Sequence, residues 1–176
     1  MKRSKSGPAV TRRGFLKGAA ALSLGVPYVI TSGALGGASR AAASERIVMG
    51  GIGMGGRGRG DFKGFMGHGE VQAVAVCDVK KGSRDRAKGE VDKKYATGDC
   101  ATYGDFRELL DRGDIDAVMV ATPDHWHAIT TIEACKRGID VFCEKPLSLT
   151  IREARAMVNA VRRYGRVFQT GSQQRA

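Results

Sequence analysis

Five short, β-rich apolar runs alternate with helical stretches after residue 44. Each run is almost continuously apolar, which is typical of a strand covered on both faces of a sheet. Strands that alternate with helices are joined by right-handed crossovers and form a parallel sheet. The sequence therefore predicts an α/β fold with a doubly wound parallel sheet. The expected strands are Arg46–Ile52, Val71–Cys77, Ile115–Ala121, Ile139–Cys143 and Val167–Thr170, and the expected helices are Gly58–Met66, Ser83–Tyr95, Phe106–Asp111, His125–Arg137 and Ile151–Tyr164.

The expected helix Ile151–Tyr164 carries signals at both of its ends. Thr150 and Glu153 have the spacing of a capping box, in which two side chains satisfy free backbone N–H groups. Gly165 can adopt the left-handed conformation that ends a helix. These two signals define the boundaries of the helix.

Glycines crowd the segment after the first expected strand. A GxGxxG pattern fits there twice, first at Gly51, Gly53 and Gly56 and again at Gly53, Gly55 and Gly58. We prefer the second register, because it lets the strand finish before the turn. In that register the glycines permit a tight turn, close approach of a pyrophosphate and close helix–strand packing. The helix N-terminus would then offer N–H groups to the phosphates. Alone, the pattern also fits a flexible loop.

An acidic residue follows the second expected strand. Asp78 stands 25 residues beyond Gly53, at the end of the run that closes with Cys77. A carboxylate at this place can accept hydrogen bonds from the adenosine ribose, which favours NAD over NADP. NADP stays open, because three basic residues that could receive its phosphate follow closely: Lys80, Lys81 and Arg84.

Two further motifs stand at the carboxyl ends of expected strands, where open α/β sheets bind ligands. They read Ala121-Thr122-Pro123-Asp124-His125-Trp126-His127 and Val141-Phe142-Cys143-Glu144-Lys145-Pro146-Leu147. With the glycine turn and Asp78, they resemble the Gfo/Idh/MocA family of nicotinamide-dependent oxidoreductases. The marks of that family include a Thr-Pro or Asn-Pro segment followed by His, and Glu-Lys-Pro. The resemblance covers residues 46–176 and implies a Rossmann NAD(P)-binding domain.

The resemblance also implies a role for individual residues. The residues that would surround the pyrophosphate are Gly53, Met54, Gly55, Arg57 and Gly58. Asp78 would bind the adenosine ribose. The residues that would line the cofactor near its diphosphate and nicotinamide ribose are Thr122, Pro123 and His127. Glu144 would face the nicotinamide ribose, Lys145 would point from the cofactor site toward the reacting centre, and Pro146 would fix the turn by a cis bond.

The implied reaction is hydride transfer to or from a sugar or polyol. As a hydride leaves a secondary alcohol, the oxygen develops negative charge, and the ammonium of Lys145 would stabilise it as the catalytic residue. An NAD-dependent glycosidase of the same family is an alternative; it would oxidise a sugar transiently, eliminate the aglycone and reduce the sugar again. A non-catalytic dinucleotide-binding fragment is a third interpretation. A methyltransferase fits less well, because Glu-Lys-Pro has no role there.

By the same resemblance, relatives continue into an α+β domain that forms the substrate pocket and the oligomer interface. We expect residues 44–170 to form the Rossmann domain and residues 171–176 to begin the junction, with that second domain absent from the chain. Hydride transfer and oligomer formation are then expected only together with it. Gln173 and Arg175, in the junction, are candidate contributors to the site.

The N-terminal segment has the composition of an export signal. Residues 1–43 contain seven basic residues and no acidic one. Thr11-Arg12-Arg13-Gly14-Phe15-Leu16-Lys17 precedes the uncharged stretch 18–30, which is too short to span a membrane. The arrangement resembles a twin-arginine signal, with Ala41–Ala43 as the cleavage site. We therefore expect export by the twin-arginine machinery to a periplasmic or other extracytoplasmic location and no stable membrane span.

The formal net charge of +11 does not indicate a nucleic-acid-binding protein. In residues 44–176, 22 basic residues accompany 18 acidic ones, without interleaved aromatic residues. No third ligand with zinc-like spacing accompanies His125 and His127, so we expect no metal. The four cysteines at positions 77, 100, 135 and 143 form no CxxC pair. Cys77 and Cys143 close apolar strands and are expected as small core residues.

Overall fold

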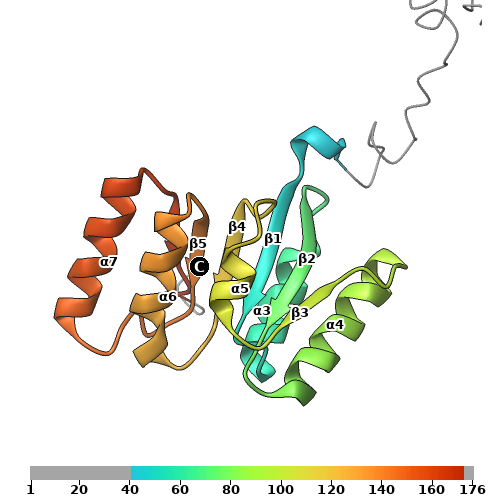
Figure 1. Cartoon of the computed structure of the whole chain (residues 1–176), viewed down its shortest axis with the longest axis horizontal. Helices are drawn as coiled ribbons and strands as arrows, with labels where there is room; N and C mark the ends of the chain where they lie inside the picture. The colour runs from blue at the N-terminus through green and yellow to red at the C-terminus, as the bar shows by residue number, and fades with distance from the viewer. Residues whose placement is uncertain (1–40, 173–176) are drawn as a thin grey trace, which may run out of the picture.

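Residues 41–172, which the computed structural model describes, contain six parallel strands in one sheet (Figure 1). The strand order is β3-β2-β1-β4-β5-β6, which is the order of a doubly wound Rossmann sheet. The strands are β1 (Ile47–Ile52), β2 (Val71–Cys77), β3 (Ala101–Tyr103), β4 (Ala117–Val120), β5 (Asp140–Cys143) and β6 (Phe168–Thr170). The helices are η1 (Ala43–Glu45), α3 (Gly56–Phe65), α4 (Lys81–Tyr95), α5 (Phe106–Leu110), α6 (Asp124–Lys136) and α7 (Ile151–Tyr164).

The structure confirms the predicted fold class and adds one strand. All five expected strands and all five expected helices are present, with boundaries shifted by two residues or fewer. The strand β3 was not predicted. It has three residues, lies at the edge of the sheet and leaves Thr102 exposed, so its sequence lacks the long apolar run that identifies a buried strand.

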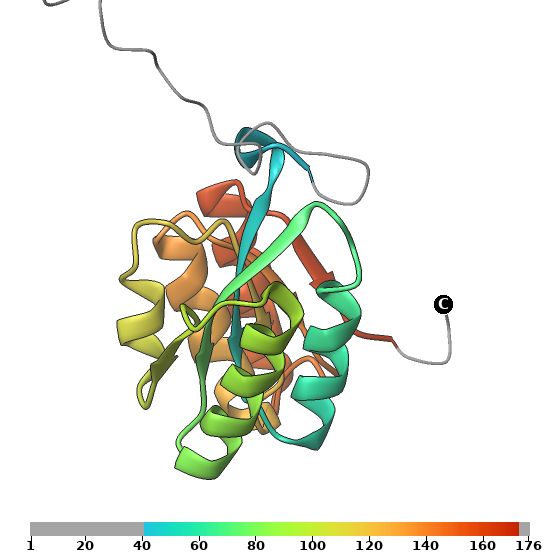
Figure 2. The same cartoon turned by 90° about the vertical axis from the view of Figure 1, so that its right-hand side faces the viewer.

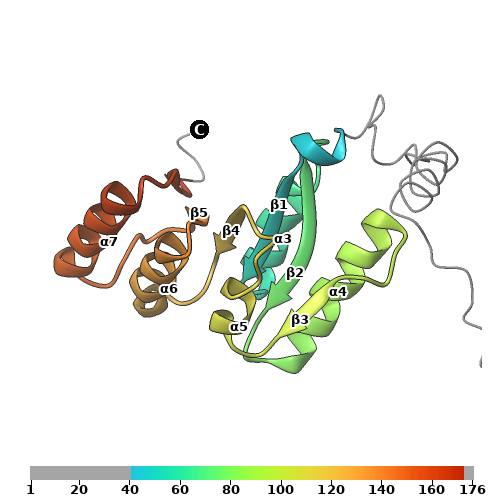
Figure 3. The same cartoon turned by 45° about the horizontal axis from the view of Figure 1, so that its top comes forward.

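Helices cover both faces of the sheet. On one face Phe62 of α3 and Val91 of α4 pack with Met49 and Val76 of the central strands. On the other face the core contains residues of α5, α6 and α7. Figure 2 shows α5 in yellow and α3 in teal on opposite sides of the strands, and Figure 3 shows α6 and α7 side by side. This double covering explains why the strands read as continuous apolar runs.

The ends of α7 follow the signals in the sequence. The side chain of Thr150 accepts a hydrogen bond from the backbone N–H of Glu153, and Glu153 accepts one from that of Thr150, which completes the capping box. Gly165 has a φ of 61° and ends the helix in the left-handed conformation. Both predictions are confirmed.

Backbone hydrogen bonds between neighbouring strands continue to the residues that directly follow the strands. Four of these bonds, each 2.8 Å long, run from Gly53 N to Cys77 O, from Ala121 N to Ile52 O, from Glu144 N to Val120 O and from Gly171 N to Cys143 O. The glycine turn and the two later motifs therefore converge at one edge of the sheet.

The twin-arginine segment, Gln173 and Arg175 lie outside the described residues, as do most of the expected signal and junction. The expected domain start at Ser44 falls within η1. Among residues 41–172, the helices are all too short or too polar to cross a membrane.

Candidate functional site

The glycine turn requires glycine at two of the positions that the preferred register assigns. Gly53 has a φ of 86°, and a Cβ atom there would lie 2.6 Å from the backbone of Ala121 and Thr122. A Cβ atom on Gly58 would overlap the carbonyl oxygen of Gly53. Gly55, in contrast, has open space around it. No side chain caps α3, so its first N–H groups face the open side of the turn, as in sites that bind phosphate.

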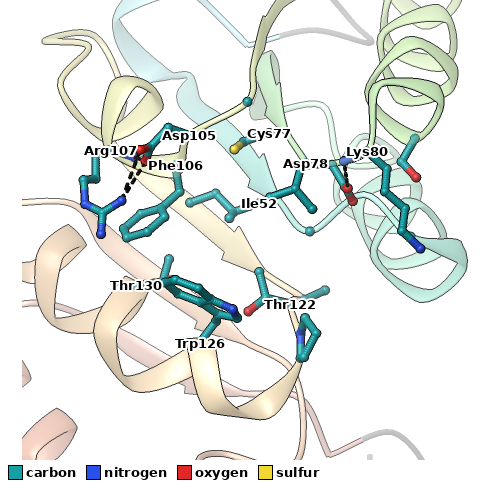
Figure 4. A pocket seen from close by; sticks show the side chains of 17 residues that line it. Ile52, Cys77, Asp78, Lys80, Asp105, Phe106, Arg107, Thr122, Trp126 and Thr130 are labelled. Atoms are coloured by element: carbon teal, nitrogen blue, oxygen red, sulfur yellow. Dashed lines mark hydrogen bonds and ion pairs between the residues drawn. The ribbon is translucent and has the colours of Figure 1, made fainter.

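A pocket of about 510 Å³ opens beside this turn (Figure 4). The expected site residues that line it are Gly53, Gly55, Asp78, Thr122 and Pro123. They come from the ends of β1, β2 and β4, which is the position where the strand order reverses and where open α/β sheets bind ligands.

Asp78 lies at one end of the pocket, beside Lys80 (Figure 4). Its Oδ1 accepts a hydrogen bond of 2.8 Å from the backbone N–H of Lys80, which fixes the carboxylate. Of the basic residues nearby, Lys81 pairs with Asp85, and Arg84 donates to the backbone oxygen of Asp78 at 2.6 Å. Lys80 is then the one of the three whose side chain lines the pocket without a partner in the described part of the chain.

Aromatic side chains form the other end of the pocket (Figure 4). The rings of Phe106 and Trp126 pack edge to face, with their centroids 6.2 Å apart. The guanidinium of Arg107 lies 4.6 Å from the Phe106 ring centroid. The hydroxyl oxygens of Thr122 and Thr130 are buried without a hydrogen-bond partner. An apolar slot with unpaired hydroxyls suits a flat heteroaromatic ring. No pattern in the sequence marks Phe106, Arg107 or Thr130 as site residues, because the first two follow the unpredicted β3 and the third depends on how α6 packs.

Arg57 connects α3 to the Glu-Lys-Pro segment. Its Nη2 donates to Asp61 Oδ1 at 2.7 Å and to Glu144 Oε1 at 3.0 Å. Glu144 is buried, and its Oε2 accepts from the backbone N–H of Lys145 at 3.0 Å. Burial raises the pKa of Asp61, and Glu144 adds to this rise while Arg57 opposes it. Asp61 carried no signal in the sequence that marked it as a site residue.

His127 is a buried residue that hydrogen-bonds to both later motifs. It is only 1% exposed and is not among the residues that line the pocket. Its Nε2 lies 2.8 Å from the carbonyl oxygen of Thr122, and its Nδ1 lies 2.8 Å from that of Pro146. The buried ring therefore joins the Thr-Pro motif to the Glu-Lys-Pro motif, and its role beside the cofactor stays a prediction.

The remaining expected residues divide into exposed and buried ones. Lys145 is exposed, and its ammonium has no partner in the described part of the chain. The peptide bond between Lys145 and Pro146 is cis, as the resemblance implies. The side chain of Met54 is fully buried against Phe62, so only its backbone borders the turn.

Neither the histidines nor the cysteines form a second centre in the described residues. Residues 41–172 contain no group of three or more side chains arranged to hold a metal ion. All four cysteines are free and buried, and burial raises the pKa of Cys77 and of Cys143 to about 12. Cys77 borders the pocket as a neutral thiol.

Comparison with known proteins identifies relatives of this chain. Residues 46–172 match a family described as "Oxidoreductase family, NAD-binding Rossmann fold". The α-N-acetylgalactosaminidase of Shewanella oneidensis is 29% identical over 171 residues, covering 88% of this chain and 37% of that protein. A glycosyl hydrolase family 109 protein of Shewanella sp. strain W3-18-1 is 35% identical over 120 residues, covering 66% of this chain and 26% of that protein. The chain thus spans about a third of the length of these relatives.

Two solved structures from Lactobacillus casei share the fold. The myo-inositol dehydrogenase in complex with NAD(H) and myo-inositol superimposes with a TM-score of 0.65 at 27% identity, over 74% of this chain and 38% of that one. The scyllo-inositol dehydrogenase with bound NAD(H) and scyllo-inositol superimposes with a TM-score of 0.64 at 26% identity, over 72% of this chain and 36% of that one.

Proposed function

Because the chain belongs to the Gfo/Idh/MocA oxidoreductase family and contains its NAD-binding Rossmann domain, we propose that it serves hydride transfer to or from a sugar or polyol. The observation that carries this proposal is the pocket beside the glycine turn, which Gly53, Gly55 and Asp78 line. Two structural neighbours hold NAD(H) together with an inositol, which is a polyol.

The described residues fit a dinucleotide. Asp78 presents a carboxylate to the pocket, Gly55 leaves open space over the N-terminus of α3, and two buried hydroxyls lack partners. Asp78 would bind the ribose, and the Phe106–Trp126 end would hold the flat base. NAD is favoured over NADP, because Lys81 and Arg84 already have partners; Lys80 is the residue that would meet a 2′-phosphate.

Lys145 is the residue that we propose for catalysis. The bound nicotinamide supplies a hydride acceptor or donor. The exposed ammonium of Lys145 would stabilise the negative charge that develops on the substrate oxygen. The carboxylate of Glu144 accepts a hydrogen bond from the backbone N–H of Lys145, and His127 hydrogen-bonds to the carbonyl oxygen of Pro146. These contacts on both sides fix the backbone of Lys145. The chain aligns with little more than a third of the inositol dehydrogenases, and we propose that substrate recognition resides in the remainder of such proteins.

A glycosidase that uses NAD without net redox change is the second candidate. The relatives named as α-N-acetylgalactosaminidase and glycosyl hydrolase favour it. The same placement of Lys145 would serve it, because the ammonium would stabilise the oxygen charge during the transient oxidation of a sugar hydroxyl. The ketone would acidify the neighbouring C–H, the aglycone would be eliminated, water would add to the double bond, and the stored hydride would reduce the ketone again. Aglycone release without net NADH formation would distinguish it from a dehydrogenase, which forms NADH in proportion to substrate.

Export through the twin-arginine pathway is also proposed. Arg12-Arg13 followed by Phe15-Leu16-Lys17 and an uncharged stretch supports it. A fusion of residues 1–46 to a reporter should reach the periplasm, and replacing both arginines with lysine should retain it in the cytoplasm. Equal export of both fusions would contradict this proposal.

The decisive experiment is a calorimetric titration of the chain after unfolding and refolding, which removes any nucleotide that copurifies. Saturable binding of NAD, weaker binding of NADP and no binding of S-adenosylmethionine are expected. If circular dichroism shows a folded chain that binds neither NAD nor NADP, the proposed function is wrong.

A further inference from the structure

One guanidinium is shared by two carboxyl groups that come from different elements. Arg57 and Asp61 stand one turn apart on α3, and Glu144 follows β5. The Nη2 of Arg57 contacts both carboxyl groups, at 2.7 Å and 3.0 Å. The side chains of Asp61 and Glu144 are 13% and 4% exposed, so water contributes little to their solvation.

The donors around these carboxyl groups are unequally distributed. Both oxygens of Glu144 accept a hydrogen bond, one from Arg57 and one from the backbone N–H of Lys145. Asp61 Oδ1 accepts from Arg57, but Asp61 Oδ2 is buried without a donor. A buried ionised oxygen without a donor is costly, whereas a protonated oxygen can itself donate. A shared proton therefore belongs on Asp61, with the ionised Glu144 as its neighbour.

The pKa of Asp61 moves in the same direction. Burial raises it most, the charge and the hydrogen-bonding side chain of Glu144 raise it further, and Arg57 lowers it. Arg57 on the same helix and Glu144 at the end of β5 are the charged groups that face Asp61 in the described part of the chain. Two adjacent carboxyl groups that share one proton are a known solution to this arrangement.

We infer that Asp61 is a positioning residue of the cofactor site: it holds a proton against Glu144, and binding of a dinucleotide favours the protonated pair. This inference rests on the proposed function. With Asp61 protonated, the three side chains have no net charge; with both carboxyl groups ionised, their net charge is negative. Nε and Nη1 of the exposed Arg57 have no partner among the described residues and can meet a diphosphate. A negative net charge beside that guanidinium would repel the diphosphate.

Cofactor binding should therefore take up a fraction of a proton. Titration of the chain with NAD in two buffers of different ionisation enthalpy measures this uptake directly. The affinity of the wild-type chain for NAD should fall as pH rises through the titration of this pair, and a shift of one pK unit on binding corresponds to a total fall of about tenfold. Asp61→Asn keeps the shape and mimics the neutral form, so it should bind NAD with little dependence on pH and without uptake from this pair. Asp111→Asn, which removes an exposed carboxylate outside the pocket, should behave like the wild type.

A second measurement reads the proton in the absence of cofactor. In carbon NMR of the chain with labelled aspartate, one side-chain carboxyl resonance should titrate above the usual aspartate range and be missing from Asp61→Asn. Equal proton uptake in wild type and Asp61→Asn, or no uptake in either, would overturn the inference while leaving NAD binding intact. Absence of NAD binding would contradict the proposed function instead, and the NMR titration would still decide where the proton lies. Should the variant not fold, the wild-type measurements decide alone.

Discussion

The imidazole of His127 lies with its Nδ1 2.8 Å from the carbonyl oxygen of Pro146, in the cis turn of the Glu-Lys-Pro segment. Its other nitrogen lies 2.8 Å from the carbonyl oxygen of Thr122, at the exit of β4. One buried ring thus connects the exits of two neighbouring strands. A neutral ring donates one of these hydrogen bonds, and a protonated ring donates both. The relative position of the two motifs depends on this contact rather than on the sheet alone.

Replacing His127 by leucine should therefore destabilise the fold by about 1–3 kcal/mol, because the buried ring no longer hydrogen-bonds to the carbonyl oxygens of Thr122 and Pro146. Urea denaturation followed by circular dichroism measures this loss. His125→Leu is the matched control, since that ring is exposed, and it should change stability by less than about 0.5 kcal/mol. Equal stability of the two variants would show that the buried ring contributes packing only.

Asp78→Ala should weaken NAD more than NADP, because it removes an acceptor for the ribose hydroxyls. The expected loss for NAD is about 1–3 kcal/mol, which calorimetry would detect as a lower association constant. Lys80→Ala should leave NAD affinity nearly unchanged and reduce any affinity for NADP, because Lys80 lines the pocket without a partner in residues 41–172. An equal loss of both nucleotides in Asp78→Ala would remove this residue from cofactor selection.

Much of the fold could be predicted from the sequence, because its signals act over only a few residues. The capping box at Thr150 and the left-handed Gly165 act within a few residues, so their pattern alone defines α7. The central strands could be predicted because helices cover both faces of the sheet, which makes these strands continuous apolar runs in the sequence. The edge strand β3 is three residues long and partly exposed, and no local pattern separates it from a loop.

The site could be predicted only as far as its backbone. Gly53 and Gly58 are recognisable because the turn itself requires them. The places of Asp61, Thr130 and His127 depend on the direction in which α3 and α6 turn their faces, which tertiary packing decides. His127 is the clearest case, since the adjacent Trp126 borders the pocket and is exposed, whereas His127 is buried.

The cysteines should be unreactive in the folded chain. Burial raises the pKa of Cys77 and Cys143 to about 12 and that of Cys100 to about 11, and the thiolate is the form that reacts. At about pH 8, a thiol reagent should modify none of the four buried thiols before unfolding and all of them after it. Fast modification of the folded chain would contradict this expectation.

The same shifts predict how alkaline pH affects stability. Each thiol has a higher pKa in the folded than in the unfolded chain, so the unfolded chain loses its protons first. The stabilisation from the protonated thiols is complete below about pH 8, near the ordinary cysteine pKa, and is lost as pH rises toward about 12. Replacing Cys143 by alanine should flatten this decline in urea titrations; an unchanged decline would assign it to other groups.

Three glycines of one segment should respond differently to alanine, because their surroundings differ. Gly60 lies in the exposed middle of α3 with no atom near a Cβ, so Gly60→Ala should stabilise the chain by about 0.5–1 kcal/mol. In Gly58→Ala the new methyl group would overlap the carbonyl oxygen of Gly53, and a loss of about 1–3 kcal/mol or more is expected. Thermal denaturation measures both changes.

Gly55→Ala separates binding from folding. Its Cβ would meet no atom of the chain, so stability should stay within about 0.5 kcal/mol of the wild type. The methyl group would stand over the N-terminus of α3, where a pyrophosphate has to approach the backbone, and NAD affinity should fall clearly in calorimetry. If Gly55→Ala binds NAD as well as the wild type does, the diphosphate lies elsewhere, and the register Gly53, Gly55 and Gly58 describes only the packing of α3 on β1.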